Sequence, residues 1–235
     1  MSVFHFKQFS VHHHGAAMKV GTDGVLLGAW AEALRPARRI LDIGTGTGLI
    51  ALMMAQRFPE AIIDAIDIEP VAALAADKNV ASSPWKERIH VEHISLQHFL
   101  KKEKNRYDMI ICNPPFFADG WKVEDPQRKL ARDAAHLPLH LILEAAEQLL
   151  LSEGALNLIL PAESGERLIR ADSKWQVRRC TKVISKEGGM VKRMLMELVQ
   201  FPVNTAEDTL IIESAVPNAY TEAYRKLTAD FYLKF

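Results

Sequence analysis

The 235-residue sequence has little cysteine, no excess of charge of either sign and no long uninterrupted apolar run. Its two cysteines, Cys112 and Cys180, cannot form a metal site by themselves, and a disulfide is not expected in a reducing compartment. The segment Met1–Phe9 lacks the continuous apolar core of a signal peptide. No uncharged apolar run approaches the roughly 18 residues that a membrane span needs. We therefore expect a cytoplasmic protein with no metal site and no membrane association.

The charge of the chain is balanced, with 29 basic and 29 acidic residues. A nucleic-acid substrate would therefore be bound by a local patch, because the protein has no global field to attract it. One candidate patch is the segment 163–193, which contains nine Lys and Arg residues and four acidic residues. A solvated charged face is the alternative interpretation of each of these residues. The individual candidates for RNA contact are Lys7, Arg128, Lys129, Arg132, Lys192 and Arg193.

From about residue 38 onward, short β-branched runs alternate with helical patterns, which is typical of βαβ units on a parallel sheet. Strands are expected at 39–43, 61–67, 89–93, 107–112 and 155–160. Helices are expected at 48–58, 70–81 and 139–151, with a glycine stop for the last of them at 150–154. The β-rich segments 176–185, 194–201 and 209–213 predict antiparallel strands that close one edge. Segment 19–30 predicts a loop that runs into a helix packed on the sheet.

A glycine-rich loop, Asp42–Gly48, lies between the first expected strand and the first expected helix of this α/β region. Gly44 and Gly46 allow backbone conformations and a close approach that a Cβ would block, and Gly48 lets the helix pack on the sheet. The G-x-G-x-G spacing differs from the G-x-G-x-x-G of dinucleotide enzymes. The loop indicates a nucleotide-like cofactor, although a tight turn of purely structural purpose is the alternative.

Acidic and hydroxyl side chains follow the next two strands. Asp67 ends the second strand, where a carboxylate can accept both hydroxyls of an unphosphorylated ribose. Glu69 is a rival for this role, but the strand is expected to end at Asp67. Ser95 follows the third strand, where an acceptor for a cofactor's adenine amine would fall, and it fits a helix N-cap equally well.

The segment Tyr107–Phe116 is an apolar run that ends in Asn-Pro-Pro-Phe. The side-chain oxygen of Asn113 and the carbonyl of Pro114 can accept the two N–H bonds of a planar amine and localise its lone pair. Pro115 biases Pro114 away from the helical region and so directs that carbonyl outward. Phe116 offers a ring on which a base can stack, worth about 1–3 kcal/mol. Beside the glycine loop this pattern predicts an N-methyltransferase dependent on S-adenosylmethionine (SAM), and a simple strand terminator is the alternative.

Other reactive side chains favour structural interpretations. Cys112 could suggest a thiolate that attacks a pyrimidine, but it lies in an apolar strand where burial makes a thiol inert. The run His12–His14 could suggest a metal, but adjacent histidines converge poorly on one ion. His136 could touch a substrate phosphate, and a solvent-exposed histidine is the preferred interpretation. The polar segment 121–133 is expected to form a loop at the mouth of the site.

The sequence resembles the bacterial tRNA1(Val) (adenine-N6)-methyltransferase family, whose members modify the adenine just after the anticodon. The segments that carry the resemblance are Phe4–Phe9, Ala17–Trp30, Asp42–Gly48, Ser83–Ile89 and Asn113–Phe117. The resemblance implies the Rossmann-like fold of class I SAM-dependent methyltransferases. That fold is a mostly parallel seven-stranded sheet with an antiparallel last strand and helices on both faces. The implied cofactor is SAM, and the implied partner is the anticodon loop of a tRNA.

The resemblance also assigns residues to roles. It places Lys19–Asp23 near the methionine end of SAM, Asp67 on the ribose and Asn113–Phe116 around the target adenine. Ser95 stands where relatives usually carry an aspartate near the cofactor adenine. The expected catalytic residues are Asn113, Pro114 and Phe116. The expected cofactor-binding residues are Lys19, Gly21, Thr22, Asp23, Asp42, Gly44, Gly46, Gly48, Asp67, Ile68, Ser95 and Asn113.

We expect one domain over residues 1–235, in which 1–37 form an extension that covers substrate and cofactor and 38–235 form the core. Asn-Pro-Pro followed by an aromatic residue also suits a glutamine amide of a protein or the N2 amine of a guanine in ribosomal RNA. An NAD-dependent oxidoreductase and a non-catalytic RNA-binding protein are the alternatives from other classes. The glycine spacing argues against the first, and the presence of Asp42, Asp67 and Asn113 argues against the second.

Overall fold

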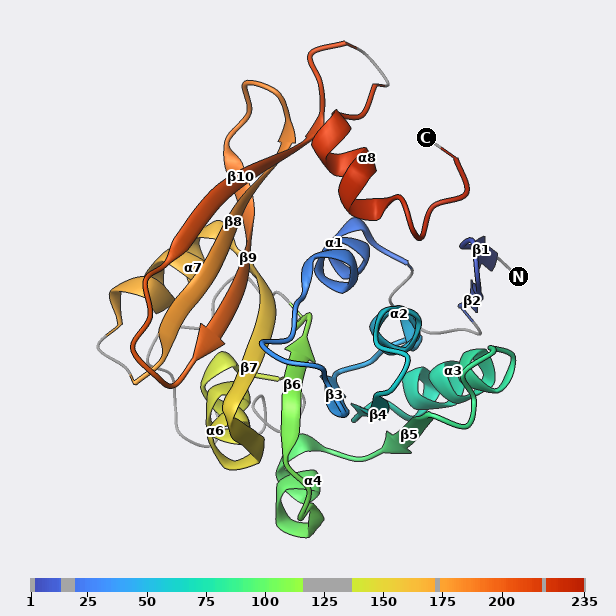
Figure 1. Ribbon diagram of the computed structural model, residues 1–235. Helices are drawn as coiled ribbons and strands as arrows, with labels where there is room; N and C mark the ends of the chain where they lie inside the picture. The colour runs from blue at the N-terminus through green and yellow to red at the C-terminus, as the bar shows by residue number, and fades with distance from the viewer. Residues whose placement is uncertain (1–2, 14–19, 116–136, 172–173, 217–218, 235) are drawn as a thin grey trace, which may run out of the picture.

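The computed structural model describes residues 3–13, 20–115, 137–171, 174–216 and 219–234. Within these residues the centre of the molecule is an eight-stranded sheet in the order β10-β8-β9-β7-β6-β3-β4-β5 (Figure 1). Its strands are β3 (Arg39–Ile43), β4 (Ile62–Asp67), β5 (Ile89–His93), β6 (Tyr107–Cys112), β7 (Leu150–Pro161), β8 (Gln176–Lys186), β9 (Val191–Val199) and β10 (Ala206–Glu213). A separate antiparallel hairpin pairs β1 (Val3–His5) with β2 (Ser10–His12).

The strand directions confirm the mostly parallel sheet of a class I methyltransferase fold and correct two of its details. Strands β3, β4, β5, β6 and β7 are parallel to one another. The sheet of the described residues has eight strands, whereas the resemblance implied seven. The antiparallel strand is β9, which lies between β7 and β8, and the last strand, β10, is parallel to β8. The eighth strand forms because 206–213 still has the backbone edge of β8 available for hydrogen bonding after β9 has paired with β7.

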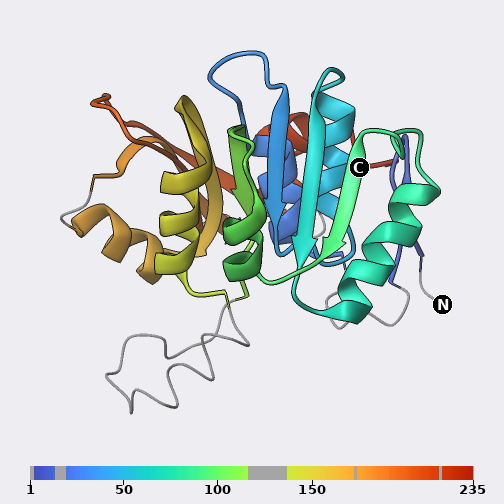
Figure 2. The same cartoon turned by 90° about the horizontal axis from the view of Figure 1, so that it is seen from below.

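Helices cover both faces of the sheet, as expected (Figures 1 and 2). One face carries α1 (Thr22–Trp30), α2 (Leu49–Arg57) and α8 (Glu222–Thr228), and the other carries α4 (Leu96–Lys102), α6 (Leu139–Leu149) and α7 (Ala162–Arg170). Helix α3 (Pro70–Ala81) packs beside β5 and the β1–β2 hairpin. Neighbouring strand residues point to opposite faces, so that Ile111 joins the core under α1 and α2 while Ile110 joins the core under α6.

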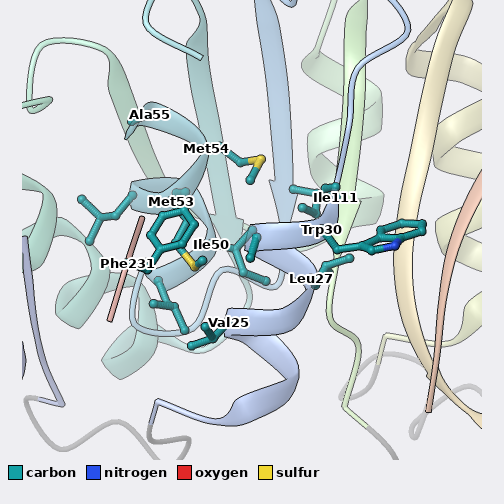
Figure 3. Close-up of a cluster of buried hydrophobic side chains, with 14 of the residues drawn as sticks. Val25, Leu27, Trp30, Ile50, Met53, Met54, Ala55, Ile111 and Phe231 are labelled. Atoms are coloured by element: carbon teal, nitrogen blue, oxygen red, sulfur yellow. The ribbon is translucent and has the colours of Figure 1, made fainter. Parts of the chain in front are cut away.

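Helix α1 is held tightly between α2 and the sheet, which confirms the helix expected in segment 19–30. Figure 3 shows Val25 and Leu27 of α1 beside Ile50 and Met53 of α2. A Cβ on Gly28 would lie 2.5 Å from the sulfur of Met53, so only glycine permits this approach. Such close packing fixes the position of α1 relative to the strands.

The far end of α1 is attached to β8 by polar contacts. The indole Nε1 of Trp30 donates a hydrogen bond of 2.8 Å to the hydroxyl of Thr181. The guanidinium of Arg179 lies 3.8 Å from the centroid of the Trp30 ring and donates a hydrogen bond to the Trp30 carbonyl. The buried carboxylate of Glu197 on β9 forms ion pairs with Arg178 and Arg179. These contacts join α1 to β8, although the two elements are far apart in the sequence.

The glycine stop that was expected at 150–154 is wrong. Helix α6 ends at Leu149 and β7 begins at Leu150 without an intervening loop. The pairing of β6 with β7 shifts here, since Tyr107 pairs with Leu150 and Met109 pairs with Ala155. A Cβ on Gly154 would lie 2.9 Å from the carbonyl oxygen of Tyr107. The absence of a side chain at Gly154 therefore permits this irregular pairing of the two strands.

None of the helices in the described parts of the chain has the length and apolar character that crossing a bilayer requires.

Candidate active site

The predicted site residues gather at one edge of the sheet. Because β3, β4 and β6 are parallel, their carboxyl ends meet, and these ends carry the Asp42–Gly48 loop, Asp67 and Asn113. A hydrogen bond of 2.8 Å from the backbone N–H of Gly46 to Oδ2 of Asp67 joins the loop to the end of β4. In open parallel sheets this edge is the usual location of a ligand site.

The glycine loop has the conformation that its sequence predicts. Gly44, Gly46 and Gly48 have φ angles of 72°, 59° and 81°, a region that residues with a Cβ rarely adopt. A Cβ on Gly48 would lie 3.3 Å from the Cα of Ala76, so this glycine lets α2 approach α3. A Cβ on Gly46 would meet no atom of the described residues within 4 Å, its chain neighbours aside. The loop therefore leaves open space in front of its central glycine.

Asp42 is completely buried behind the loop. Its Oδ2 accepts hydrogen bonds from the hydroxyl of Thr45 at 2.6 Å and from the backbone N–H of Ala51 at 3.2 Å. Its Oδ1 is buried without a hydrogen-bond partner among the described residues. Burial raises the pKa of Asp42 to about 7, although the hydrogen bonds from Thr45 and Ala51 oppose this rise.

Asp67 is shared between the loop and the start of α3. Its Oδ1 accepts a hydrogen bond of 2.9 Å from the backbone N–H of Glu69, while Oδ2 accepts the bond from Gly46. Burial raises the pKa of Asp67, and these two backbone bonds lower it in part. A carboxylate has about four acceptor positions, so Asp67 retains capacity for further donors. Glu69 has an exposed side chain.

Asn113 follows β6 directly and is half-buried. Its Oδ1 atom is buried and has no hydrogen-bond partner among the described residues. A Cβ built on Gly24 of α1 would lie 3.9 Å from Nδ2 of Asn113. Pro114 is buried and Pro115 is exposed, while Phe116 lies outside the described residues. An orphaned buried acceptor is costly to a fold, which makes it a candidate binding group.

The amino end of α1 lies beside Asn113. Gly21 is the N-cap residue of α1, and Thr22 and Asp23 form its first turn. Oδ2 of Asp23 accepts a hydrogen bond of 2.8 Å from Nε of Arg193 on β9. The sequence predicted neither this ion pair nor the contact of Gly24 with Asn113, because no local pattern indicates either of them. Lys19 lies outside the described residues.

Two more predicted cofactor residues lie beyond the end of β4 and β5. Ser95 is the N-cap of α4, and its hydroxyl accepts a hydrogen bond from the backbone N–H of His98. The N-cap interpretation of Ser95 is therefore confirmed, and its contact with a cofactor adenine stays a prediction. Ile68 is 41% exposed, and its contact with a cofactor stays a prediction.

Most basic residues of segment 163–193 form ion pairs within the protein, and RNA binding by this segment stays a prediction. Seven of its nine basic residues form ion pairs with acidic side chains: Arg167, Arg170, Lys174, Arg178, Arg179, Lys182 and Arg193. Within the described residues, Lys186 and Lys192 form none. Of the other RNA candidates, Lys7 donates a hydrogen bond to the carbonyl of Ala229, and residues 128, 129 and 132 lie outside the described residues.

The remaining reactive side chains have structural surroundings. Cys112 is fully buried, and burial raises the pKa of its thiol well above the ordinary value, which confirms the core interpretation. The backbone of His12 exchanges hydrogen bonds with the side chain of Asn79. His14, His136 and the segment 121–133 lie outside the described residues. No group of three or more His, Cys, Asp or Glu that could hold a metal occurs in the described part of the chain.

The sequence of this chain is similar to those of known methyltransferases. The family model of the methyltransferase small domain matches residues 19–172. The chain is 42% identical over 236 residues to a tRNA1(Val) (adenine(37)-N6)-methyltransferase of Haemophilus influenzae, covering 100% of both proteins. It is 44% identical over 233 residues to a protein of the same name from Parabacteroides distasonis, covering 98% of both.

A solved structure shows the same fold. The predicted O-methyltransferase Atu636 of Agrobacterium tumefaciens superimposes with a TM-score of 0.64 at 20% sequence identity. The match covers 89% of this chain and 96% of that one. At this identity the likeness speaks for the fold alone.

Proposed function

Because the chain belongs to the tRNA1(Val) (adenine(37)-N6)-methyltransferase family, we propose that it transfers a methyl group from SAM to the N6 amine of a tRNA adenine. The proposed target is adenine 37, which follows the anticodon. The support is identity along the whole chain together with the arrangement of the site residues.

The observation that carries the proposal is the buried Oδ1 of Asn113 at the carboxyl end of β6, which has no hydrogen-bond partner among the described residues. An exocyclic amine of a base is a poor nucleophile, since its lone pair is delocalised into the ring. An acceptor for each N–H bond localises that lone pair on nitrogen. We assign one acceptor to Asn113 Oδ1 and the other to the carbonyl of Pro114, with Phe116 as the stacking ring.

The glycine loop fits SAM as the cofactor. The space in front of Gly46, which a Cβ would enter without meeting a neighbour, suits the close approach of a nucleoside. Asp67 has acceptor capacity left for ribose hydroxyls after its two backbone bonds. The other proposed cofactor residues are Lys19, Gly21, Thr22, Asp23, Asp42, Gly44, Gly48, Ile68, Ser95 and Asn113.

The bound cofactor supplies a methyl group that is already activated as a sulfonium, so no metal is needed for the transfer. The chain's own residues hold and orient the adenine, and orientation is their main contribution. Asn113 and Pro114 hold the amine by its two hydrogens. The proton is released once the nitrogen is alkylated, because the amine then becomes strongly acidic, and no dedicated base is assigned. An adenine within a stacked loop has to swing out to reach this edge.

We further propose that residues 1–37 act as an extension that covers substrate and cofactor, over a core of 38–235 in one domain. The position of α1 against Asn113 supports this division, because Gly24 belongs to the extension and Asn113 belongs to the core.

Incubation of the purified protein with methyl-labelled SAM and bulk tRNA tests the function. Digestion of the RNA to nucleosides should yield labelled N6-methyladenosine. Parallel incubations with ribosomal RNA and with total protein cover the guanine and glutamine alternatives. Label in either of those fractions, with none in tRNA, would reject the proposal.

A further inference from the structure

A cavity with a volume of about 470 Å³ lies near the amino end of α1. Its walls come from the amino end of α1, the ends of β8, β9 and β10, and the aromatic residues of the chain termini. The volume falls within the roughly 300–1,000 Å³ of ordinary ligand sites. The residues that matter to its chemistry are Phe4, Tyr220, Tyr224, Tyr232, Lys192 and Lys234.

The aromatic side chains of the cavity pack against one another. Tyr224 is buried, with its ring centroid 5.1 Å from that of Tyr220 and 6.3 Å from that of Tyr232. Phe4 extends the group, with its ring centroid 6.1 Å from that of Tyr232. Tyr220 is 42% exposed, so part of this supported side chain is open to a ligand. Such rings stack with any base, because every base has a π face.

The charged residues of the cavity suit a phosphate. Lys192 and Lys234 have exposed side chains that form no ion pair with the described residues. Asp23, which also lines the cavity, is paired with Arg193. Besides Asp23, Glu213 is the other acidic residue that lines the cavity. Among the basic residues of 163–193, Lys192 is one of only two without an ion pair in the described parts of the chain.

The cavity opens at the same edge of the sheet as Asn113. Thr22 and Asp23 line it, and the next residue, Gly24, lies against the side chain of Asn113. Arg193 on β9 pairs with Pro161 at the carboxyl end of β7, which is the neighbour of β6. The first turn of α1 thus contributes both to the wall of the cavity and to the surroundings of Asn113.

We propose that this cavity binds a second, unpaired nucleotide of the same RNA, with its base on Tyr220 and its phosphate near Lys192 and Lys234. The inference rests on the proposed function, since it assigns a second contact to that substrate. Proteins that recognise loop nucleotides commonly splay the bases onto aromatic side chains. The cavity would then hold the neighbour of the adenine and fix the strand while the adenine occupies the Asn113 site.

Fluorescence anisotropy with a labelled RNA stem-loop that carries adenines in its loop tests the proposal, in the presence of S-adenosylhomocysteine. Tyr220→Leu should weaken binding by roughly 5- to 100-fold, the range expected for loss of one base stack. Tyr220→Phe keeps the ring and should bind nearly as well as the wild type. Calorimetry should show unchanged affinity of Tyr220→Leu for S-adenosylhomocysteine, which establishes that the variant is folded.

A lysine pair provides a second test that leaves the aromatic group intact. The double variant Lys192→Gln and Lys234→Gln should weaken RNA binding and reduce the salt dependence of log Kd by roughly one unit of slope. The matched control is Lys101→Gln with Lys104→Gln, which removes the same charge close to the amino end of β6, at the opposite edge of the sheet. Its salt dependence should match that of the wild type.

The outcomes separate this inference from the proposed function. Equal RNA affinity of wild type, Tyr220→Leu and the Lys192/Lys234 variant would overturn the inference, while labelled N6-methyladenosine from the wild type would still support the function. Absence of RNA binding by the wild type would also overturn it. Weakened binding in both variants, with the control unaffected, would establish the second nucleotide site.

Discussion

Gly24 of α1 lies against the side chain of Asn113, so that a Cβ at Gly24 would be 3.9 Å from Asn113 Nδ2 and 3.0 Å from Leu49 Cδ2. The first contact is ordinary van der Waals packing, and the second is tight. A Cβ at position 24 would therefore touch the carboxamide of Asn113, and a larger side chain would compete with it for space. Through this contact, the segment before the glycine loop takes part in shaping the proposed adenine site.

The Gly24→Val substitution should impair turnover more than folding. Its added methyl groups enter the space beside Asn113 and Leu49 and displace the carboxamide. A misplacement of about 1 Å can reduce the rate by roughly 10²-fold, and we expect a fall in kcat of that order. Steady-state methylation of tRNA measures this, with thermal unfolding as the check on folding.

Gly28→Ala on the same helix is the matched comparison. Its Cβ would lie 2.5 Å from the sulfur of Met53, away from Asn113, and overpacking of this kind costs about 1–3 kcal/mol. It should lower stability and spare kcat. Equal effects of the two variants on kcat would contradict a specific role of Gly24.

Asn113→Ala should lower kcat by roughly 10²–10³-fold, the usual loss for one hydrogen bond made to the transition state. The affinity for SAM should fall by less than kcat does, because Oδ1 of Asn113 accepts from the adenine amine in this scheme. The neighbouring substitution Cys112→Ala is the control. The pKa of this buried thiol is raised well above its ordinary value, so it supplies no thiolate and its loss should leave kcat nearly unchanged. Near-normal turnover of Asn113→Ala would remove the basis of the mechanism.

Asp67→Asn should weaken SAM binding by roughly 10- to 100-fold, the equivalent of one hydrogen bond to a charged acceptor. The exposed Glu69 offers the control, and Glu69→Gln should change the affinity by less than about twofold, on the order of a surface substitution. Titration calorimetry with SAM compares the two. A larger loss in Glu69→Gln would transfer the ribose contact to that residue.

The pH dependence of stability should report on Asp42. Its pKa is raised to about 7 in the folded protein from an ordinary value near 4, so the folded state holds a proton that the unfolded state has released between these values. The stability from this group is complete below about pH 4 and is lost as the pH rises toward 7. Asp42→Asn lacks this dependence.

Urea unfolding without cofactor between pH 5 and pH 8 measures the effect. The free energy of unfolding of the wild type should fall relative to Asp42→Asn by about 2–3 kcal/mol over this range. Parallel curves for the two proteins would show that Asp42 is ionised throughout.

Local sequence patterns were sufficient for much of the core. The bounds of α3, β5 and β6 are those expected, because a proline marks the first helical turn and β-branched residues such as Ile89, Val91, Ile110 and Ile111 favour the strands. The left-handed conformations of the glycine loop also follow from residue type, since glycine adopts them at the least cost. The candidate cofactor-binding residues could therefore be chosen from the order of strands and loops along the chain alone.

Contacts between distant residues decided the rest. The place of β9 between β7 and β8, the ion pair of Asp23 with Arg193 and the packing of Gly24 on Asn113 all join segments that no local pattern connects. The basic residues of 163–193 show the same principle, because their composition suggests a patch and the fold supplies acidic partners for most of them. The sequence by itself determined the strands of the main sheet, four of the helices and which side chains end the strands. Only the tertiary structure decided which charges remain open to a ligand, because burial and pairing depend on what the folded chain brings beside each residue.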